Sequence, residues 1–185
     1  AIAGAHGGRV VTSLPSPYFD AVERLSAPSW RERKEAVAQL KASIADDRRR
    51  DEVMQPLAER LLDGLLSPDA LEGRAACHEV LVAMAPRSTD AVLRRLDAHG
   101  PAPRLLIDLL GELGERSAVP RCAQILADDD ADTNLRASAA SALGRLGGPE
   151  ASAALRGALS VRPQMLVVHV LDALHGMGAK VDVTS

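Results

Sequence analysis

Apolar residues recur along the chain in a pattern that repeats about every 30 residues. Four segments share it and can be anchored at Ala85, Gly114, Gly147 and Gly178, which are 29, 33 and 31 residues apart. A leucine stands four residues before each anchor, and a leucine or methionine stands one residue before it. These two positions are three residues apart, so they share one face of an α-helix. Each segment is therefore predicted to be an amphipathic helix, and three of the four end at a glycine suited to a left-handed turn.

A second amphipathic stretch follows each of the first three anchors, over residues 89–96, 118–126 and 150–159. An apolar residue stands at the same offset from the anchor in all three stretches: Leu93, Cys122 and Leu155. Turn-forming sequences separate the units. These are His99-Gly100-Pro101, Asp128-Asp129-Asp130 and Val161-Arg162-Pro163. The repeating unit is therefore helix, short turn, helix, loop.

The same plan is predicted upstream in a longer form. Ser29 is a favoured N-cap for a helix from Trp30 to about Ile44. The charged run over residues 46–51 breaks that helix, and a second helix follows, rich in leucine and ended by Ser67-Pro68. A short helix from Tyr18 to Leu25 is expected to cover the N-terminal end of the stack.

One stretch of these repeats resembles a known family. Residues 135–159, LRASAASALGRLGGPEASAALRGAL, resemble the HEAT repeat, especially the short bacterial form found in phycobilin lyases, and the matching core is residues 136–147. The segment WRERKEAVAQL over residues 30–40 is also similar to HEAT first helices. The resemblance implies an all-α fold, a right-handed α-solenoid of about four and a half helical hairpins.

The domain organisation expected from this pattern is simple. Residues 1–16 are expected to form a flexible lead or linker, residues 17–180 a single HEAT-repeat domain, and residues 181–185 a frayed tail. The first residue is not methionine and the first nine are rich in glycine and alanine. This start suggests a segment of a larger polypeptide. Arginine carries most of the positive charge, which is associated with GC-rich bacterial genomes.

Composition narrows the class of protein further. The chain is 46% hydrophobic but only 2% aromatic, so its core must be aliphatic, and its net charge is −3. Cys77 and Cys122 stand singly in apolar stretches, as buried reduced thiols do. No apolar run approaches the roughly 20 residues that span a bilayer, and no signal peptide opens the chain. A disulfide scaffold and a membrane protein are excluded, and a cytoplasmic setting is expected.

Candidate catalytic groups are few. His78-Glu79 is the most suggestive pair, because HEAT proteins similar to deoxyhypusine hydroxylase hold two irons through several His-Glu pairs. The equivalent positions here are Ile107-Asp108, Ala140-Ser141 and Leu171-Asp172, and one pair cannot hold two metals. Phosphate-binding loops and nucleophile motifs are also missing from the sequence. We therefore expect no metal, no cofactor, no small-molecule substrate and no enzyme activity.

Two alternatives to a simple binding protein come from the resemblance. HEAT-like DNA glycosylases use a basic face, and a similar stripe is conceivable here. Its arginines are Arg94, Arg95, Arg104, Arg121, Arg145, Arg156 and Arg162. A negative net charge and the scarcity of aromatic residues favour solvated helix faces instead. Kinship with phycobilin lyases is the enzyme alternative, but the similarity stops at the repeat.

The function predicted from the sequence is a non-enzymatic scaffold that presents a groove, lined mostly by second helices, to another protein. An excess of arginine on those helices suits an acidic segment of the partner. Trp30 starts a helix, where it either meets a partner or packs against Tyr18 or Phe19. The candidate partner-binding residues are Trp30, Arg60, Asp63, Arg94, Arg95, Arg121, Gln124 and Arg156.

Overall fold

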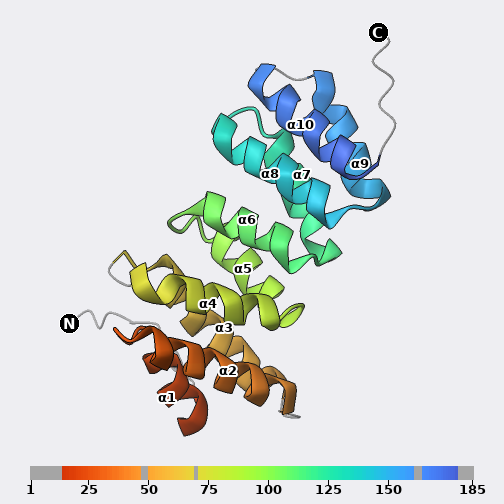
Figure 1. Cartoon of the computed structure of the whole chain (residues 1–185). Helices are drawn as coiled ribbons and strands as arrows, with labels where there is room; N and C mark the ends of the chain where they lie inside the picture. Colours follow the sequence, from red (N-terminus) through yellow and green to blue (C-terminus); the bar gives the residue numbers. More distant parts are fainter. Residues whose placement is uncertain (1–13, 47–49, 69–70, 161–163, 179–185) are drawn as a thin grey trace, which may run out of the picture.

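The computed structural model describes residues 14–46, 50–68, 71–160 and 164–178, which form helices joined by short turns (Figure 1). The all-α prediction is confirmed. The helices are α1 (Ser16–Arg24), α2 (Trp30–Asp46), α3 (Arg50–Leu66), α4 (Leu71–Ala83), α5 (Arg87–Asp97), α6 (Pro103–Leu113), α7 (Val119–Ala127), α8 (Thr133–Leu146), α9 (Gly148–Gly157) and α10 (Gln164–Gly176). Short 3-10 turns precede α7 (Arg116–Ala118) and follow α9 (Ala158–Ser160).

Most of the sequence-based boundaries agree with these helices. Ser29 is the predicted N-cap, and its hydroxyl accepts from the Glu32 amide at 3.5 Å. The predicted breakers 99–101 and 128–130 separate α5 from α6 and α7 from α8. The breaker 161–163, most of the predicted lead 1–16 and the predicted tail 181–185 lie outside the described residues.

The helices stack in two layers. A first-helix layer consists of α2, α4, α6, α8 and α10, and a second-helix layer consists of α1, α3, α5, α7 and α9 (Figure 1). Each first-layer helix packs on its neighbours in that layer and on the second-layer helix that precedes it in the chain. Because the hairpins follow one another in file, contacts are made with near neighbours along the stack. This is the architecture of an α-solenoid.

Helix α1 takes a second-layer position at the N-terminal end. It packs on α2 and α3 in the way that α3 packs on α4 and α5. Its buried residues include Tyr18 and Leu25, and the Tyr18 hydroxyl donates to the Ser43 carbonyl oxygen of α2 at 3.2 Å. The predicted N-terminal cover is therefore present, and it occupies a second-layer position.

The repeated apolar positions form one continuous core. The four leucines of the sequence pattern, Leu81, Leu110, Leu143 and Leu174, are fully buried in a cluster that runs from Tyr18 to Leu174. The residues next to the anchors are buried or half-buried. Gly114 ends α6 in the predicted left-handed conformation, with φ 72° and ψ 8°. Gly147 also has a positive φ of 67°, but its ψ of −172° makes the backbone extended rather than left-handed, a conformation that glycine adopts far more readily than other residues.

Small residues set the spacing between first-layer helices in the C-terminal half. A Cβ added to Gly111 on α6 would lie 3.0 Å from Ala142 Cα on α8, and one added to Gly144 on α8 would lie 2.9 Å from Ala173 Cβ on α10. Backbones that approach so closely exclude larger side chains at these crossings. Alanine and glycine at these positions therefore allow neighbouring first-layer helices to pack at short distance, which larger side chains would prevent.

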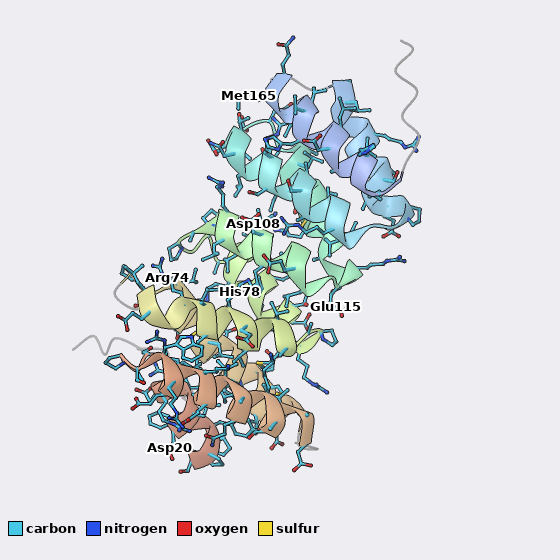
Figure 2. The ribbon with its side chains drawn as sticks, viewed as in Figure 1. Asp20, Arg74, His78, Asp108, Glu115 and Met165 are labelled. Atoms are coloured by element: carbon cyan, nitrogen blue, oxygen red, sulfur yellow. The ribbon has the colours of Figure 1, made fainter. Side chains whose placement is uncertain are left out.

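Arginines tie successive hairpins together. Arg33, Arg74 and Arg136 each stand seven residues before a buried leucine of a first-layer helix. Each donates to carbonyl oxygens in the last turn of the preceding second-layer helix or in the turn that follows it (Figure 2 labels Arg74). Such terminal carbonyls have no partner within their own helix, and they favour a cation. The bonds join Arg33 Nη1 to the oxygens of Ala27 (2.6 Å) and Pro28 (2.8 Å), Arg74 Nη2 to that of Ser67 (2.8 Å) and Arg136 Nε to that of Leu126 (3.0 Å).

The glycine crossings yield a test of the stacking. Gly144→Ala should lower the free energy of unfolding by roughly 1–3 kcal/mol, because the new methyl group meets the backbone of α10. Gly157→Ala on α9 is the matched control, since nothing lies within 4 Å of the added Cβ, and it should be neutral or slightly stabilising. Urea denaturation followed by circular dichroism measures both. Equal midpoints for the two variants would contradict the close approach of α8 and α10.

Candidate functional site

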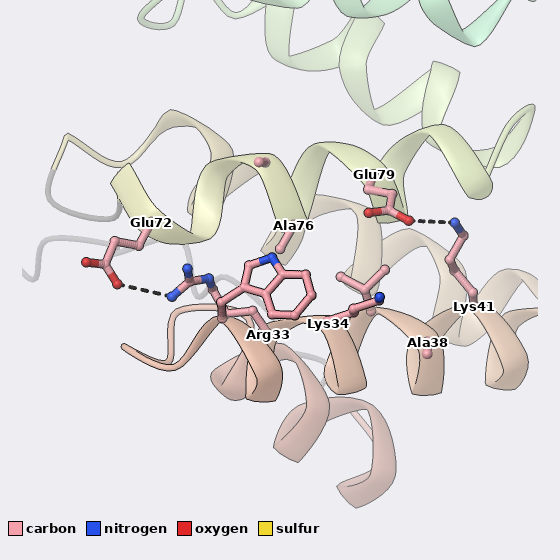
Figure 3. Close-up of a pocket in the computed structure, with 10 residues that line it drawn as sticks. Arg33, Lys34, Ala38, Lys41, Glu72, Ala76 and Glu79 are labelled. Carbon is pink, nitrogen blue, oxygen red and sulfur yellow. Dashed lines mark hydrogen bonds and ion pairs between the residues drawn. The ribbon is translucent and has the colours of Figure 1, made fainter.

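A groove of about 430 Å³ lies between α2 and α4 on the first-helix layer (Figure 3). Because the two helices run side by side, each presents one face to it at the i, i+3, i+4, i+7 spacing of a helix. Lining residues are Trp30, Arg33, Lys34, Val37, Ala38 and Lys41 from α2, and Glu72, Ala75, Ala76 and Glu79 from α4.

Two ion pairs bridge the groove. Arg33 Nη1 lies 3.1 Å from Glu72 Oε2, and Lys41 Nζ lies 2.8 Å from Glu79 Oε1 (Figure 3). In both pairs the cation belongs to α2 and the carboxylate to α4. Besides these pairs and Lys34, the groove is lined by Trp30 and by the small or apolar side chains of Val37, Ala38, Ala75 and Ala76.

Trp30 forms part of the groove wall. It is 66% exposed, and the Lys34 ammonium lies 4.9 Å from the centroid of its ring. Of the two alternatives left open for Trp30, packing beneath the N-terminal helix does not agree with this exposure, and the side chain lines the groove between α2 and α4 instead. A largely exposed indole beside a hollow is typical of a surface that meets a partner.

A second groove of similar volume lies between α8 and α10, also on the first-helix layer. It is lined by Ser141, Gly144, Arg145, His169, Asp172, Ala173 and Gly176. Both grooves therefore run between first-layer helices. A groove lined mostly by second helices, as expected from the sequence, stays a prediction. Four of the five arginines predicted for it, all but Arg156, pair with carboxylates on neighbouring helices of the second-helix layer.

Ion pairs connect neighbouring helices of the second-helix layer. Arginines of α3, α5 and α7 each pair with carboxylates on the preceding helix of the same layer, which is α1, α3 and α5 respectively. The predicted surplus of positive charge on this layer is therefore largely neutralised within the chain. Arg94 also donates to the Gln55 side chain. The pairs are Arg60–Glu23 (2.7 Å), Arg94–Glu59 (3.3 Å), Arg95–Glu59 (2.7 Å), Arg95–Asp63 (2.9 Å) and Arg121–Asp97 (2.7 Å).

Arg95 is the most enclosed of these cations. Burial works against its charge, but hydrogen bonds to Glu59 and Asp63 outweigh that effect and raise its pKa above the ordinary value. The remaining predicted residues are less constrained. Arg121 donates to Gln124 at 2.8 Å, and Arg156 donates to Ser152 at 3.4 Å within α9. A role of these second-layer residues in partner binding stays a prediction.

His78 and Glu79 point to opposite neighbours. His78 Nε2 lies 3.1 Å from Glu112 Oε2 on α6, whereas Glu79 pairs with Lys41 on α2 (Figure 3). The two side chains cannot converge on one ion from these positions. Among the residues that the structure describes, no group of three or more His, Cys, Asp or Glu side chains is placed to hold a metal.

The two cysteines are core residues. Cys77 and Cys122 are buried free thiols, and burial raises the pKa of each to about 11. Little thiolate forms at neutral pH, so neither sulfur is poised as a nucleophile.

The two-layer stack of helical hairpins defines the class of protein as an α-solenoid, and a family comparison gives the repeat type. Residues 89–174, from within α5 to within α10, match the family model for HEAT repeats. Residues 89–174 are therefore HEAT repeats, as the resemblance of residues 135–159 implied. A search of curated proteins finds no match to this sequence. Across the described ranges, no helix is both long enough and apolar enough to cross a membrane.

Most of the groove was not found from the sequence. Trp30 was predicted as a contact residue, but Lys34, Lys41, Glu72 and Glu79 were not. A signal existed, because the cations of α2 recur at helical spacing on the face that carries Trp30. What the sequence did not show is that α4, some 40 residues later, supplies the matching carboxylates.

The ion pairs of the second-helix layer can be tested for a structural role. Arg95→Ala should lower the free energy of unfolding by about 1 kcal/mol, because its side chain is only 19% exposed and pairs with two carboxylates. Arg94→Ala is the adjacent control, and it should cost less than about 0.5 kcal/mol, since that side chain is 54% exposed. Urea denaturation compares them. If both substitutions left the free energy of unfolding unchanged, the ion pairs would have no structural role, and this would favour partner binding as the role of these arginines.

Proposed function

We propose that this chain is a non-enzymatic scaffold that binds a segment of a partner protein in the groove between α2 and α4. HEAT repeats commonly mediate protein interactions. The single observation that carries the proposal for this groove is Trp30, a large aromatic side chain held at 66% exposure on a well-packed helix.

The mechanism is rigid display. The helices that form the groove belong to one continuous core, and the two ion pairs across the groove hold α2 and α4 at a fixed spacing. A partner segment therefore meets side chains that are already in place, and the scaffold loses little conformational entropy on binding. Tryptophan is favoured at such positions because it buries a large area with few rotatable bonds.

The nucleic-acid alternative receives less support. Binding to a phosphate backbone depends on cations that are free to replace counterions. Most arginines proposed for such a stripe on the second-helix layer already face carboxylates within the chain. The phycobilin-lyase-like alternative rests on the sequence resemblance, and no side-chain arrangement described above adds to it.

Trp30 supplies both the site and its reporter, because it is the one tryptophan of the chain. Peptides selected on the folded protein from a displayed random library should shift the Trp30 emission to shorter wavelengths on binding. Trp30→Ala should weaken their binding roughly tenfold to thirtyfold, as measured by calorimetry, with an unchanged melting temperature. The loss follows from removing the largest apolar contact in the groove.

Phe19→Ala is the matched control for this experiment. Phe19 is an exposed aromatic residue on α1, and it does not line the groove. It should therefore leave peptide affinity unchanged. Equal affinities for the wild type and Trp30→Ala would refute the proposed groove. Selective binding of oligonucleotides that depends on Trp30 would favour the nucleic-acid alternative.

A further inference from the structure

The charges that line the α2–α4 groove do not balance. Three cations from α2, Arg33, Lys34 and Lys41, face two carboxylates from α4, Glu72 and Glu79. Arg33 and Lys41 take these carboxylates, at 3.1 and 2.8 Å. Within the part of the chain that the structure describes, Lys34 makes no ion pair, and its ammonium rests against the Trp30 ring. One positive charge is therefore left over in the groove.

The surplus charge lies between the two ion pairs. Lys34 stands between Arg33 and Lys41 along α2, and Ala76 stands between Glu72 and Glu79 on α4 (Figure 3). Trp30, Ala75 and Ala76 supply apolar surface to the same groove. The groove thus combines an apolar recess, an aromatic wall and a cation without a carboxylate partner.

We propose that the occupant of this groove is an acidic peptide segment of a partner protein, in which an Asp or Glu carboxylate pairs with Lys34 and an adjacent apolar side chain lies against Trp30, Ala75 and Ala76. The inference rests on the proposed function and adds the chemistry of the ligand. The charges of groove and ligand would be complementary, because one carboxylate of the ligand would balance the single excess positive charge of the groove lining.

A basic segment fits this groove less well. To pair with Glu72 it would displace Arg33, whose side chain is only 18% exposed and is fixed by the Ala27 and Pro28 carbonyl oxygens. That cation would be left without its carboxylate in a partly buried position, which is costly. An acidic segment breaks no existing ion pair. A nucleic-acid strand is also disfavoured, because Glu72 and Glu79 flank the recess and repel consecutive phosphates.

The test is a comparison of peptide selections on the whole chain. A displayed random library is selected on the wild type and on Lys34→Glu, both with unchanged melting temperatures. Peptides from the wild type should be enriched in Asp or Glu next to an apolar residue. Reversal of the charge should remove that enrichment and favour Lys or Arg at the same place.

Affinities of the selected peptides then isolate the ion pair. Lys34→Gln should weaken binding roughly three- to fivefold, as loss of one exposed ion pair does, and it should reduce the dependence of binding on NaCl concentration. Arg31→Gln is the charge-matched control on the same helix, because Arg31 is highly exposed and lies outside the groove. It should leave the affinity unchanged.

The possible results separate the two proposals. Peptides that need Trp30 but carry no acidic residue and ignore Lys34 would overturn this inference and leave the proposed function intact. Failure to obtain any Trp30-dependent peptide would overturn both. Equal losses for Lys34→Gln and Arg31→Gln would show a general effect of net charge, and would also overturn the inference.

Discussion

The structure depends on burying the aliphatic face of each hairpin against the next. A single pair of short helices cannot hide such a face, so stability comes from a core shared along the whole stack. With almost no aromatic residues available, the chain closes this core with leucine and lets small residues bring backbones together, as at Gly111 and Gly144. Tight stacking in turn fixes the position of each helix, and therefore the positions of the side chains that line the groove between α2 and α4.

Charged residues have a different task on each layer. On the second-helix layer arginines neutralise carboxylates of the neighbouring helix, and the Arg95 cluster with Glu59 and Asp63 is the clearest case. On the first-helix layer the pairs Arg33–Glu72 and Lys41–Glu79 bridge the groove. Lys34, which lines the same groove, lies against the Trp30 ring and has no carboxylate partner among the described residues. The same residue types therefore pair neighbouring helices on one surface and line an open groove on the other. Net charge alone does not distinguish these two uses.

The fold was predictable from the sequence, whereas most of the site was not. Leucines at fixed offsets from Gly114, Gly147 and Gly178 are local signals, and helix periodicity converts them directly into buried faces. Ion pairs such as Lys41–Glu79 join residues 38 positions apart, and they depend on the rotation of each helix about its axis. Periodicity restricts that rotation only coarsely. For this reason Trp30 was identified, but its neighbours across the groove were not.

The arginine bonds between hairpins are not repeated at every junction. At the register of Arg33, Arg74 and Arg136, helix α6 carries Pro103, whose ring has no hydrogen to donate. The junction of α5 and α6 is thus held by apolar packing without this polar fastening. Val167 stands at the same register on α10, so the α9–α10 junction also lacks this bond, and three of the five junctions between the described helices have it. Polar contributions to the stacking therefore differ from one junction to the next, whereas the apolar core runs through all of them.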